Sequence, residues 1–288
     1  TTRAGREPLI AFPAGPHPVD SRDTDPGGGS PSMQLRTVTA TRYVTPLREG
    51  GSLPAIVEAD DDGMYVLKFR GAGQGARALI AELLAGELAR ACGLNVPEIV
   101  LVDVDPKLAR TEPDPEIQDL IRASAGLNLA LDFLPGAAAF DPVVTPVDAP
   151  LASAIVWLDA YLANVDRTAR NVNLLLWHRR LWLIDHGAAL YYQHAPGSLP
   201  ARAREPFPLI RDHVLLPQAE ELREADARLA ARLTPEVIAG VVDLIPESWF
   251  GAPGGGPARS DYAEYLRRRL QPPRAFVQEA IHARSLSV

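Results

Sequence analysis

The amino-acid sequence predicts an α+β fold of two lobes, a β-rich N-terminal lobe followed by a mainly helical C-terminal lobe. Three observations support this prediction. Apolar and polar residues alternate in short segments between residues 37 and 69, apolar residues recur at helical spacing in much of the chain after residue 151, and Pro135-Gly136 interrupts the chain between the two regions. We therefore expect residues 36–134 to form the N-terminal lobe, an antiparallel sheet plus a helix, and residues 135–288 to form the C-terminal lobe.

Residues 1–35 differ from the rest of the chain, because Pro, Gly, Ser and Asp recur in them and apolar residues are few. Such a segment cannot bury enough apolar surface to order itself, and it lacks the continuous apolar stretch of a secretory signal. We predict a disordered leader. Met33, just before the first predicted strand, is a candidate for the natural start of the protein.

The composition excludes several classes of protein. A chain of 288 residues that is 47% hydrophobic can bury a sizeable core, and a formal net charge of −7 gives no reason to expect a nucleic-acid partner. No apolar run approaches the roughly 18 residues that a membrane helix needs. Cys92 is the single cysteine, so an internal disulfide is excluded, and no Cys/His cluster has zinc-ligand spacing. These features together predict a cytoplasmic protein without a membrane span.

Three antiparallel strands are expected in the N-terminal lobe, at residues 37–44, 55–59 and 64–69. Gly50-Gly51-Ser52 separates the first two, and Asp62-Gly63 makes a tight turn into the third. Because side chains alternate between faces, Lys68 shares a face with apolar neighbours. A lone lysine there would normally extend its ammonium group to solvent. The motifs that follow argue that Lys68 is not alone.

Residues 77–92 are expected to form a helix that Gly93 ends. The helix carries two acidic candidates for pairing with Lys68. Glu87 falls among the leucines and could instead pair with Arg90, whereas Glu82 lies on a face of small residues, where another segment could approach closely. The helix pattern does not decide between the two glutamates, and Glu82 could simply be solvated.

The remaining elements follow in order along the chain. A strand at residues 99–104 and a loop or short helix at 105–119 precede an apolar run at 127–134, and a helix at 151–162 precedes two short strands. If Pro135-Gly136 is the hinge between lobes, the backbone of Leu131, Asp132 and Phe133 would meet an adenine ring. The predicted short strands and C-terminal helices are 173–177, 181–184, 218–233, 235–244 and 261–270.

The chemistry-bearing residues gather between Asn164 and Gly187. Asp166 is followed five residues later by Asn171, and a predicted hairpin then leads to Asp185-His186-Gly187. In a magnesium-dependent phosphoryl-transfer site, Asp166 would face the acceptor hydroxyl, while Asn171 and Asp185 would hold the metal. An Asp and an Asn five residues apart more often cap or turn the backbone. The ordered set of strand lysine, helix glutamate, apolar hinge strand and these two motifs is more specific.

Several motifs carry a resemblance to a known family. The segments are Asn164-Val165-Asp166-Arg167, Asn171-Val172-Asn173-Leu174-Leu175, Leu183-Ile184-Asp185-His186-Gly187, Tyr65-Val66-Leu67-Lys68-Phe69, Ala81-Glu82-Leu83, Gly93-Leu94-Asn95-Val96-Pro97, Asp212-His213-Val214-Leu215-Leu216 and Pro246-Glu247-Ser248-Trp249. In these segments the chain resembles the HipA-like branch of the protein-kinase-like superfamily, and in particular the small stand-alone HipA-like proteins of bacteria. The Asp-Arg and Asp-x-Gly forms are also similar to those of phosphatidylinositol kinases. The resemblance covers nearly all of the chain after the leader.

The resemblance implies a protein-kinase-like fold with ATP and Mg²⁺ as cofactors and a role for each matching residue. Lys68 would contact the nucleotide phosphates, and Glu82, by its register with Gly93, would be the partner of Lys68. Asp166 would be the catalytic aspartate, with Asn171 and Asp185 as the magnesium ligands. The implied phosphate-covering turn is Gly50, Gly51 and Ser52. That turn departs from G-x-G-x-x-G, and His186 replaces the Phe common in protein kinases, where we expect a structural role.

The predicted activity is ATP- and magnesium-dependent transfer of a γ-phosphoryl group to a hydroxyl, with a protein Ser/Thr as the first expectation. A small molecule or a lipid headgroup is the alternative acceptor. A pseudokinase that binds nucleotide or a partner is the alternative from another class, although the joint presence of Lys68, Asp166, Asn171 and Asp185 argues against it. Full-length HipA toxins carry an additional N-terminal domain that the leader is too short to supply, so a toxin role is not assumed.

Three features outside these motifs have two interpretations each. Tyr191, Tyr192 and Ser198 lie where a kinase places its substrate or activation segment, but isolated loop hydroxyls are usually solvated. The run 267–269 is all arginine, which fits a solvated helix face or a surface for phosphate or acidic peptides. Trp157, Trp249 and Phe250 are expected to anchor the core rather than to bind a ligand.

Overall fold

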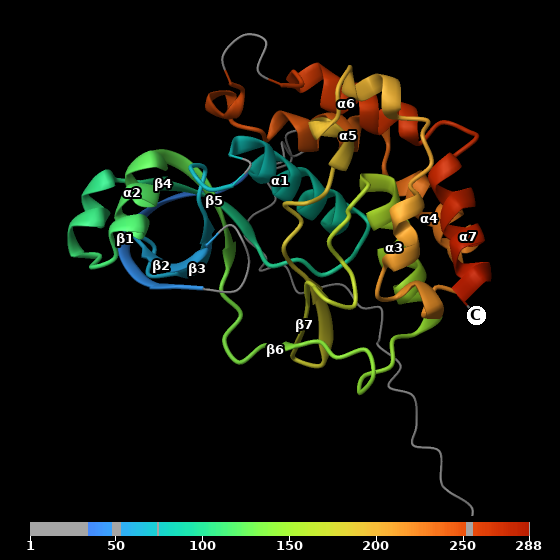
Figure 1. Cartoon of the computed structure of the whole chain (residues 1–288), viewed down its shortest axis with the longest axis horizontal. Helices are drawn as coiled ribbons and strands as arrows, with labels where there is room; N and C mark the ends of the chain where they lie inside the picture. The colour runs from blue at the N-terminus through green and yellow to red at the C-terminus, as the bar shows by residue number, and fades with distance from the viewer. Residues whose placement is uncertain (1–33, 48–52, 74, 252–255, 288) are drawn as a thin grey trace, which may run out of the picture.

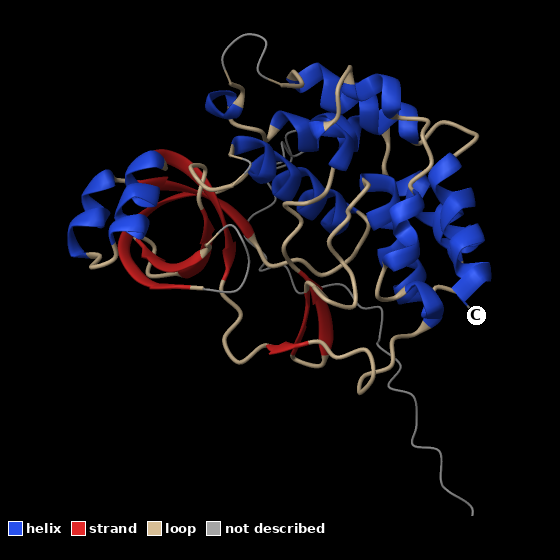
Figure 2. Cartoon of the chain, viewed as in Figure 1, coloured by secondary structure: helices blue, strands red, loops and turns tan. Residues whose placement is uncertain are grey.

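The computed structural model describes residues 34–47, 53–73, 75–251 and 256–287. A β-barrel forms one end of the molecule and a group of helices forms the other, with α1 between them (Figures 1 and 2). The strands are β1 Thr37–Pro46, β2 Ala55–Ala59, β3 Met64–Lys68, β4 Ile99–Val104, β5 Gly126–Asp132, β6 Ala138–Ala139, β7 Leu174–Trp177 and β8 Arg180–Leu183. The α-helices are α1 Ala76–Ala91, α2 Pro115–Ala123, α3 Ala149–Leu162, α4 Leu222–Arg232, α5 Pro235–Asp243, α6 Arg259–Arg269 and α7 Ala275–Ser287. This arrangement confirms the predicted α+β fold with a β-rich N-terminal lobe and a helical C-terminal lobe.

Short 3₁₀ helices connect many of these elements. They are η1 Pro106–Thr111, η2 Tyr191–His194, η3 Leu199–Arg202, η4 Pro208–Asp212, η5 Leu216–Gln218 and η6 Glu247–Trp249. No helix among the described residues is long and apolar enough to cross a bilayer.

The N-terminal sheet closes into a barrel in the order β1-β2-β3-β5-β4. The neighbours are antiparallel as predicted, except that β1 pairs with β4 in parallel and so closes the ring. We predicted an antiparallel sheet, and the parallel pairing of β1 with β4 departs from that prediction. The register between β1 and β2 is irregular at Ala40/Arg42 and at Tyr43/Thr45. Irregularities of this kind bend a strand and increase its twist, which lets one long strand reach both edges of the sheet.

Alternation along the barrel strands serves two hydrophobic cores. On β4, Val100, Val102 and Val104 point into the barrel, where Ile117 and Ile121 of α2 also pack. Ile99 and Leu101, which point to the opposite face of β4, contact the second core, which α1 and the C-terminal helices share. Since β3 lies in the same barrel, its inward residues Tyr65 and Leu67 leave Lys68 on the opposite face.

Helix α1 is apolar on nearly all sides, and this explains its central position, because a helix without a polar face is stable only when other elements surround it. Gly86 lets the helix approach the barrel. A Cβ atom at Gly86 would lie 2.5 Å from Cδ1 of Ile99, closer than van der Waals contact allows. The face of small residues predicted around Glu82 is therefore where α1 meets other segments.

Helix α3 delivers the chain to the motif region. Asp148 caps its first turn by accepting a hydrogen bond from the Leu151 amide at 2.8 Å. The helix ends at Leu162, and the next residue, Ala163, has a left-handed backbone with φ of 49°. Trp157 is buried and donates to Asp226, and Trp249 is buried and donates to the Leu127 carbonyl, so both tryptophans anchor the core as predicted.

Some boundaries differ from the sequence-based expectations. The helix expected over 218–233 begins at Leu222, because η5 and a turn occupy the preceding residues, and α7 was not predicted. Gly50, Gly51 and Ser52 lie outside the described residues, as do residues 1–33 of the predicted leader. Leu35, at the end of that leader, packs against the core.

The prediction that the arginines at 267–269 form a solvated face is wrong for Arg269. Arg269 is buried, and its guanidinium donates to the carbonyls of Tyr161 at 2.7 Å and of Ala160 and Glu205 at 2.9 Å each. A further bond of 3.2 Å reaches the Ala203 carbonyl. Arg269 therefore ties the segment after η3 to the end of α3.

Replacing Arg269 with Met is expected to lower the free energy of unfolding by about 3 kcal/mol or more, because buried carbonyls that lose their donor cost about 1–3 kcal/mol each. Urea denaturation measures the change. Arg268→Met is the matched control. Arg268 is exposed, and its ion pair among the described residues is with Glu264, one turn away, so its loss should cost less than about 0.5 kcal/mol. Equal destabilisation of the two variants would contradict the role given to Arg269.

Candidate functional site

Lys68 is the centre of a charged cluster between the barrel and α1. Its side chain is 11% exposed, and its ammonium group lies 2.8 Å from Oε2 of Glu82 and forms a second ion pair with Oδ1 of Asp185. Burial favours the neutral lysine, but the charges of Glu82 and Asp185 outweigh it and raise the pKa of Lys68 above its ordinary value. Lys68 is therefore a fixed cation rather than a solvent-exposed one.

Glu82 is completely buried beside that cation. Burial alone would raise its pKa, yet the charge of Lys68 and a contact with His186 hold the pKa of Glu82 well below its ordinary value. Nδ1 of His186 lies 3.3 Å from Oε1 of Glu82. His186, in the segment after β8, thus packs against α1, and its Nε2 has no hydrogen-bond partner among the described residues.

Glu87, the other candidate, does not reach Lys68. Its carboxylate lies 3.6 Å from Nε of Arg90, one helical turn away, as the local alternative anticipated. Burial raises the pKa of Glu87 above its ordinary value. Of the two glutamates on α1, the structure brings only Glu82 into contact with Lys68.

Asp166 lies in the loop between α3 and β7 and is half-buried. Its Oδ2 accepts a hydrogen bond of 2.8 Å from the side-chain amide of Asn171, while the Asn173 amide donates to the Asp166 carbonyl, also at 2.8 Å. Burial and the charge of Asp185 raise the pKa of Asp166, and the bond from Asn171 opposes them. Oδ1 accepts no hydrogen bond from the described residues.

Asp185 follows β8 directly and has a backbone φ of 55°. Asp tolerates this left-handed region better than most residues, because its short polar side chain makes local hydrogen bonds. The side chain is 42% exposed. The turn directs the carboxylate towards Lys68, and the next residues, His186 and Gly187, pass close to α1, where a Cβ atom on Gly187 would lie 3.6 Å from Oε2 of Glu82.

The donor set fits a magnesium ion. Mg²⁺ prefers oxygen ligands and usually takes one or two from protein and the rest from water and phosphate. Asn171 turns its amide nitrogen to Asp166, which leaves its oxygen for a cation, and Asp185 has one carboxylate oxygen beyond the pair with Lys68. No group of three or more His, Cys, Asp or Glu residues with metal-site geometry occurs in the described part of the chain.

The three residues expected at an adenine ring lie at the end of β5. The amide of Asp132 donates to the Glu98 carbonyl at 2.8 Å, and the amide of Phe133 donates to the Met64 carbonyl at 3.0 Å. Leu131 is buried between β3 and β4. Barrel contacts already use both backbone amides. If Asp132 or Phe133 forms a backbone hydrogen bond with an adenine, its carbonyl oxygen would therefore be the acceptor.

A second group of polar residues lies beneath the Asp166 loop, and the sequence analysis did not select it. Asp159 of α3 is completely buried and accepts hydrogen bonds from Arg167 at 2.6 Å and from Asn164 at 2.9 Å. His213 contacts the same carboxylate at 2.9 Å. Burial opposes the charge of Asp159, but Arg167 and His213 keep the pKa of Asp159 well below its ordinary value. The sequence did contain a signal for this group, because Asp159 is the one charged residue in the otherwise apolar helix α3.

The hydroxyl groups considered for phosphorylation have different environments. Tyr192 is buried and donates to the Pro206 carbonyl at 2.6 Å, so it is neither solvated nor accessible. Tyr191 and Ser198 are exposed.

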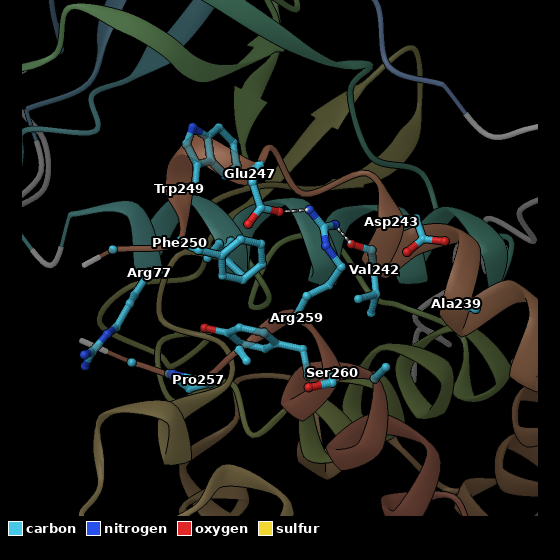
Figure 3. A pocket seen from close by; sticks show the side chains of 16 residues that line it. Arg77, Ala239, Val242, Asp243, Glu247, Trp249, Phe250, Pro257, Arg259 and Ser260 are labelled. Carbon is cyan, nitrogen blue, oxygen red and sulfur yellow. Dashed lines mark hydrogen bonds and ion pairs between the residues drawn. The ribbon is translucent and has the colours of Figure 1, made fainter. Parts of the chain in front are cut away.

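A pocket of about 630 Å³ lies elsewhere in the molecule, between α1, α5 and α6 (Figure 3). Ile80 of α1 lines it, and Ile80 and Glu82 point in nearly opposite directions because successive helical residues are about 100° apart. Arg259 crosses the pocket and donates to the Val242 carbonyl at 2.8 Å and to Glu247 at 3.1 Å. None of the residues predicted for the candidate site lines this pocket.

Comparisons with known proteins give a family and a fold. The model of a family described as HipA-like kinase matches residues 41–253. Among solved structures, the Golgi casein kinase with Mn/ADP bound has a TM-score of 0.51 at 14% identity, covering 88% of this chain and 76% of that one. The Helicobacter pylori proinflammatory kinase CtkA has a TM-score of 0.48 at 14% identity, covering 88% of this chain and 99% of that one. No curated protein matches the sequence. At such low identity the likeness to the Golgi casein kinase shows the fold alone.

Proposed function

Because the chain belongs to the HipA-like kinase family, we propose that it transfers the γ-phosphoryl group of ATP to a hydroxyl group with the help of Mg²⁺. The contact of Lys68 with both Glu82 and Asp185 is the observation that carries this proposal. This contact brings β3, α1 and the segment after β8 together. The neighbouring Asp166 loop adds a carboxylate oxygen, Oδ1, that accepts no hydrogen bond from the described residues. A buried, permanently charged lysine next to two carboxylates suits the binding of phosphate.

The proposed reaction uses the residues of this chain in distinct ways. Asp166 accepts the proton of the attacking hydroxyl through Oδ1. A bond forms between the hydroxyl oxygen and the γ-phosphorus, and the bond from the γ-phosphorus to the oxygen that bridges it to the β-phosphate breaks, releasing ADP. Lys68 offers its charge to the phosphates, and Glu82 orients Lys68. Asn171 and Asp185 would hold Mg²⁺, which when bound neutralises charge that develops on the phosphates.

We propose a protein Ser/Thr as the acceptor, on the likeness to the HipA-like kinases. A small molecule or a lipid headgroup is the other acceptor class, and a pseudokinase that only binds nucleotide is the alternative without chemistry. The simultaneous presence of Lys68, Asp166, Asn171 and Asp185 supports the enzyme, because nucleotide binding alone needs no proton acceptor such as Asp166.

The direct test incubates the protein with Mg²⁺ and γ-labelled ATP, with and without a Ser/Thr peptide library, and follows label on protein or peptide and released phosphate. Asp185→Asn should reduce the signal by about 100-fold or more, because a neutral side chain no longer stabilises the metal that offsets phosphate charge. Asp119→Asn, an exposed change on α2, is the matched control and should leave the signal unchanged. A wild-type protein that binds ATP but never turns it over would favour the pseudokinase, and an unaffected Asp185→Asn variant would remove Asp185 from the metal site.

A further inference from the structure

The buried carboxylate of Asp159 connects both halves of the candidate site. Through Oδ1 it accepts from Asn164, whose own side-chain oxygen accepts from the Asp166 amide at 3.2 Å. Through Oδ2 it accepts from Arg167, whose guanidinium also contacts the carbonyl of Asn173 and, at 3.5 Å, that of Ile184. Ile184 immediately precedes Asp185, so the orientation of one carboxylate bears on the positions of Asp166 and Asp185 together.

His213 is the third group on this carboxylate, and it comes from a different part of the chain, between η4 and η5. Its Nε2 lies 2.9 Å from Oδ2 of Asp159, and its Nδ1 accepts a hydrogen bond of 3.0 Å from the Leu215 amide. Because Nδ1 accepts, the ring proton of the neutral imidazole must be on Nε2, where it is donated to Asp159. Burial lowers the pKa of His213 although Asp159 opposes the shift, so the neutral ring is the relevant form.

The backbone joins the same two segments. The Val214 amide donates to the Arg167 carbonyl at 3.0 Å, and Thr168 and His213 form an isolated antiparallel bridge. The segment that carries His213 therefore lies directly beside the Asp166 loop. Its contacts with that loop are made by the backbone, whereas its contact with Asp159 depends on the imidazole.

We propose that His213 is a positioning residue for phosphoryl transfer. Its Nε2–H group donates a hydrogen bond to Asp159, and this bond fixes the spacing between Asp166 and Asp185. This proposal rests on the proposed function. Partners that orient a reacting group through one intermediate residue typically change activity or metal affinity by about 10- to 100-fold when they are lost.

Two substitutions at His213 separate positioning from structural support. In His213→Gln the amide nitrogen can replace Nε2 and still donate to Asp159, whereas the acceptor for the Leu215 amide is lost. In His213→Asn the amide oxygen can replace Nδ1 and still accept from the Leu215 amide, but the side chain is too short to reach Asp159. Each variant thus loses one buried hydrogen bond, and the two should have similar melting temperatures.

The readouts are kcat and KM for ATP, the melting temperature, and the affinity for ADP in the presence and absence of Mn²⁺. We expect His213→Asn to lower kcat by about 10- to 100-fold with little change in KM, and His213→Gln to stay within about threefold of the wild type. His213→Asn should also weaken the Mn²⁺-dependent part of ADP binding by about tenfold and leave metal-free ADP binding unchanged.

Each outcome bears on the proposal. A folded His213→Gln variant that loses kcat as much as His213→Asn would overturn it, as would His213→Asn with wild-type kcat. If His213→Asn does not fold, His213→Gln alone still decides, because a folded glutamine variant with more than about tenfold lower kcat contradicts the assigned contact. If the wild type binds Mn²⁺ and ADP without transferring phosphate, the proposed function fails, and the Mn²⁺ readout still tests His213. A wild type that binds no ADP even with Mn²⁺ would overturn both.

Discussion

Asp166→Asn is expected to lower kcat for phosphoryl transfer by about 10²- to 10⁴-fold, the usual contribution of a positioned proton acceptor. The asparagine keeps the shape of the side chain, and the hydrogen bond from the Asn173 side-chain amide to the backbone carbonyl of residue 166 does not depend on the carboxylate. KM for ATP should therefore change by less than about threefold. Steady-state kinetics with γ-labelled ATP and a Ser/Thr peptide that the wild type phosphorylates measures both constants.

Asp166→Ala provides the comparison for this experiment. It removes the contact with Asn171 as well as the charge, so it should lose at least as much kcat and should bind Mg²⁺ and ATP more weakly if Asn171 moves. Asp141→Asn, in the loop after β6, is the matched exposed control. Transfer within threefold of the wild type in both Asp166 variants would show that this carboxylate takes no part in the reaction.

Lys68→Met is expected to abolish measurable transfer and to destabilise the protein as well. The methionine fills a similar volume but leaves His186 as the remaining polar partner of the fully buried Glu82 among the described residues. Removing one partner of a buried ion pair typically costs about 3–5 kcal/mol, because the remaining charge is uncompensated. Urea denaturation at neutral pH measures the loss, and nucleotide binding by calorimetry measures the separate effect on the site.

The pH dependence of that loss has a defined sign. In the wild type the pKa of Glu82 is depressed, so its stabilising contribution is present above the pKa of unfolded glutamate and is lost as pH falls through the folded value. Without Lys68, burial should dominate and raise the pKa of Glu82, which makes the protonated form the more stable one in the folded variant. The deficit of Lys68→Met should therefore shrink between neutral pH and about pH 4–5.

Lys68→Met combined with Glu82→Gln is the control for this interpretation. With both charges removed, most of the lost stability should return, whereas phosphoryl transfer should stay absent because no cation faces the phosphates. A double variant as unstable as Lys68→Met would show that the destabilisation comes from packing and not from the unpaired carboxylate of Glu82.

The sequence by itself determined the local elements and the order of the motifs. Alternation placed Lys68 opposite Tyr65 and Leu67, Asp62-Gly63 marked the turn into β3, and the break at Gly93 ended α1, because each depends only on neighbouring residues. The fold class followed from those signals and from the motif order, and the family match is consistent with it.

Only the tertiary structure decided which distant groups meet. Glu82 and Glu87 are about 140° apart around a helix, and sequence alone does not say which side of α1 faces β3. The parallel pairing of β1 with β4, the burial of Arg269 and the shared contact of Asp159 with Arg167 and His213 likewise depend on packing between segments far apart in the chain. From sequence alone a charged residue is expected to be solvated. Only the tertiary structure shows the carbonyls or opposite charges that compensate a buried charge for its lost hydration.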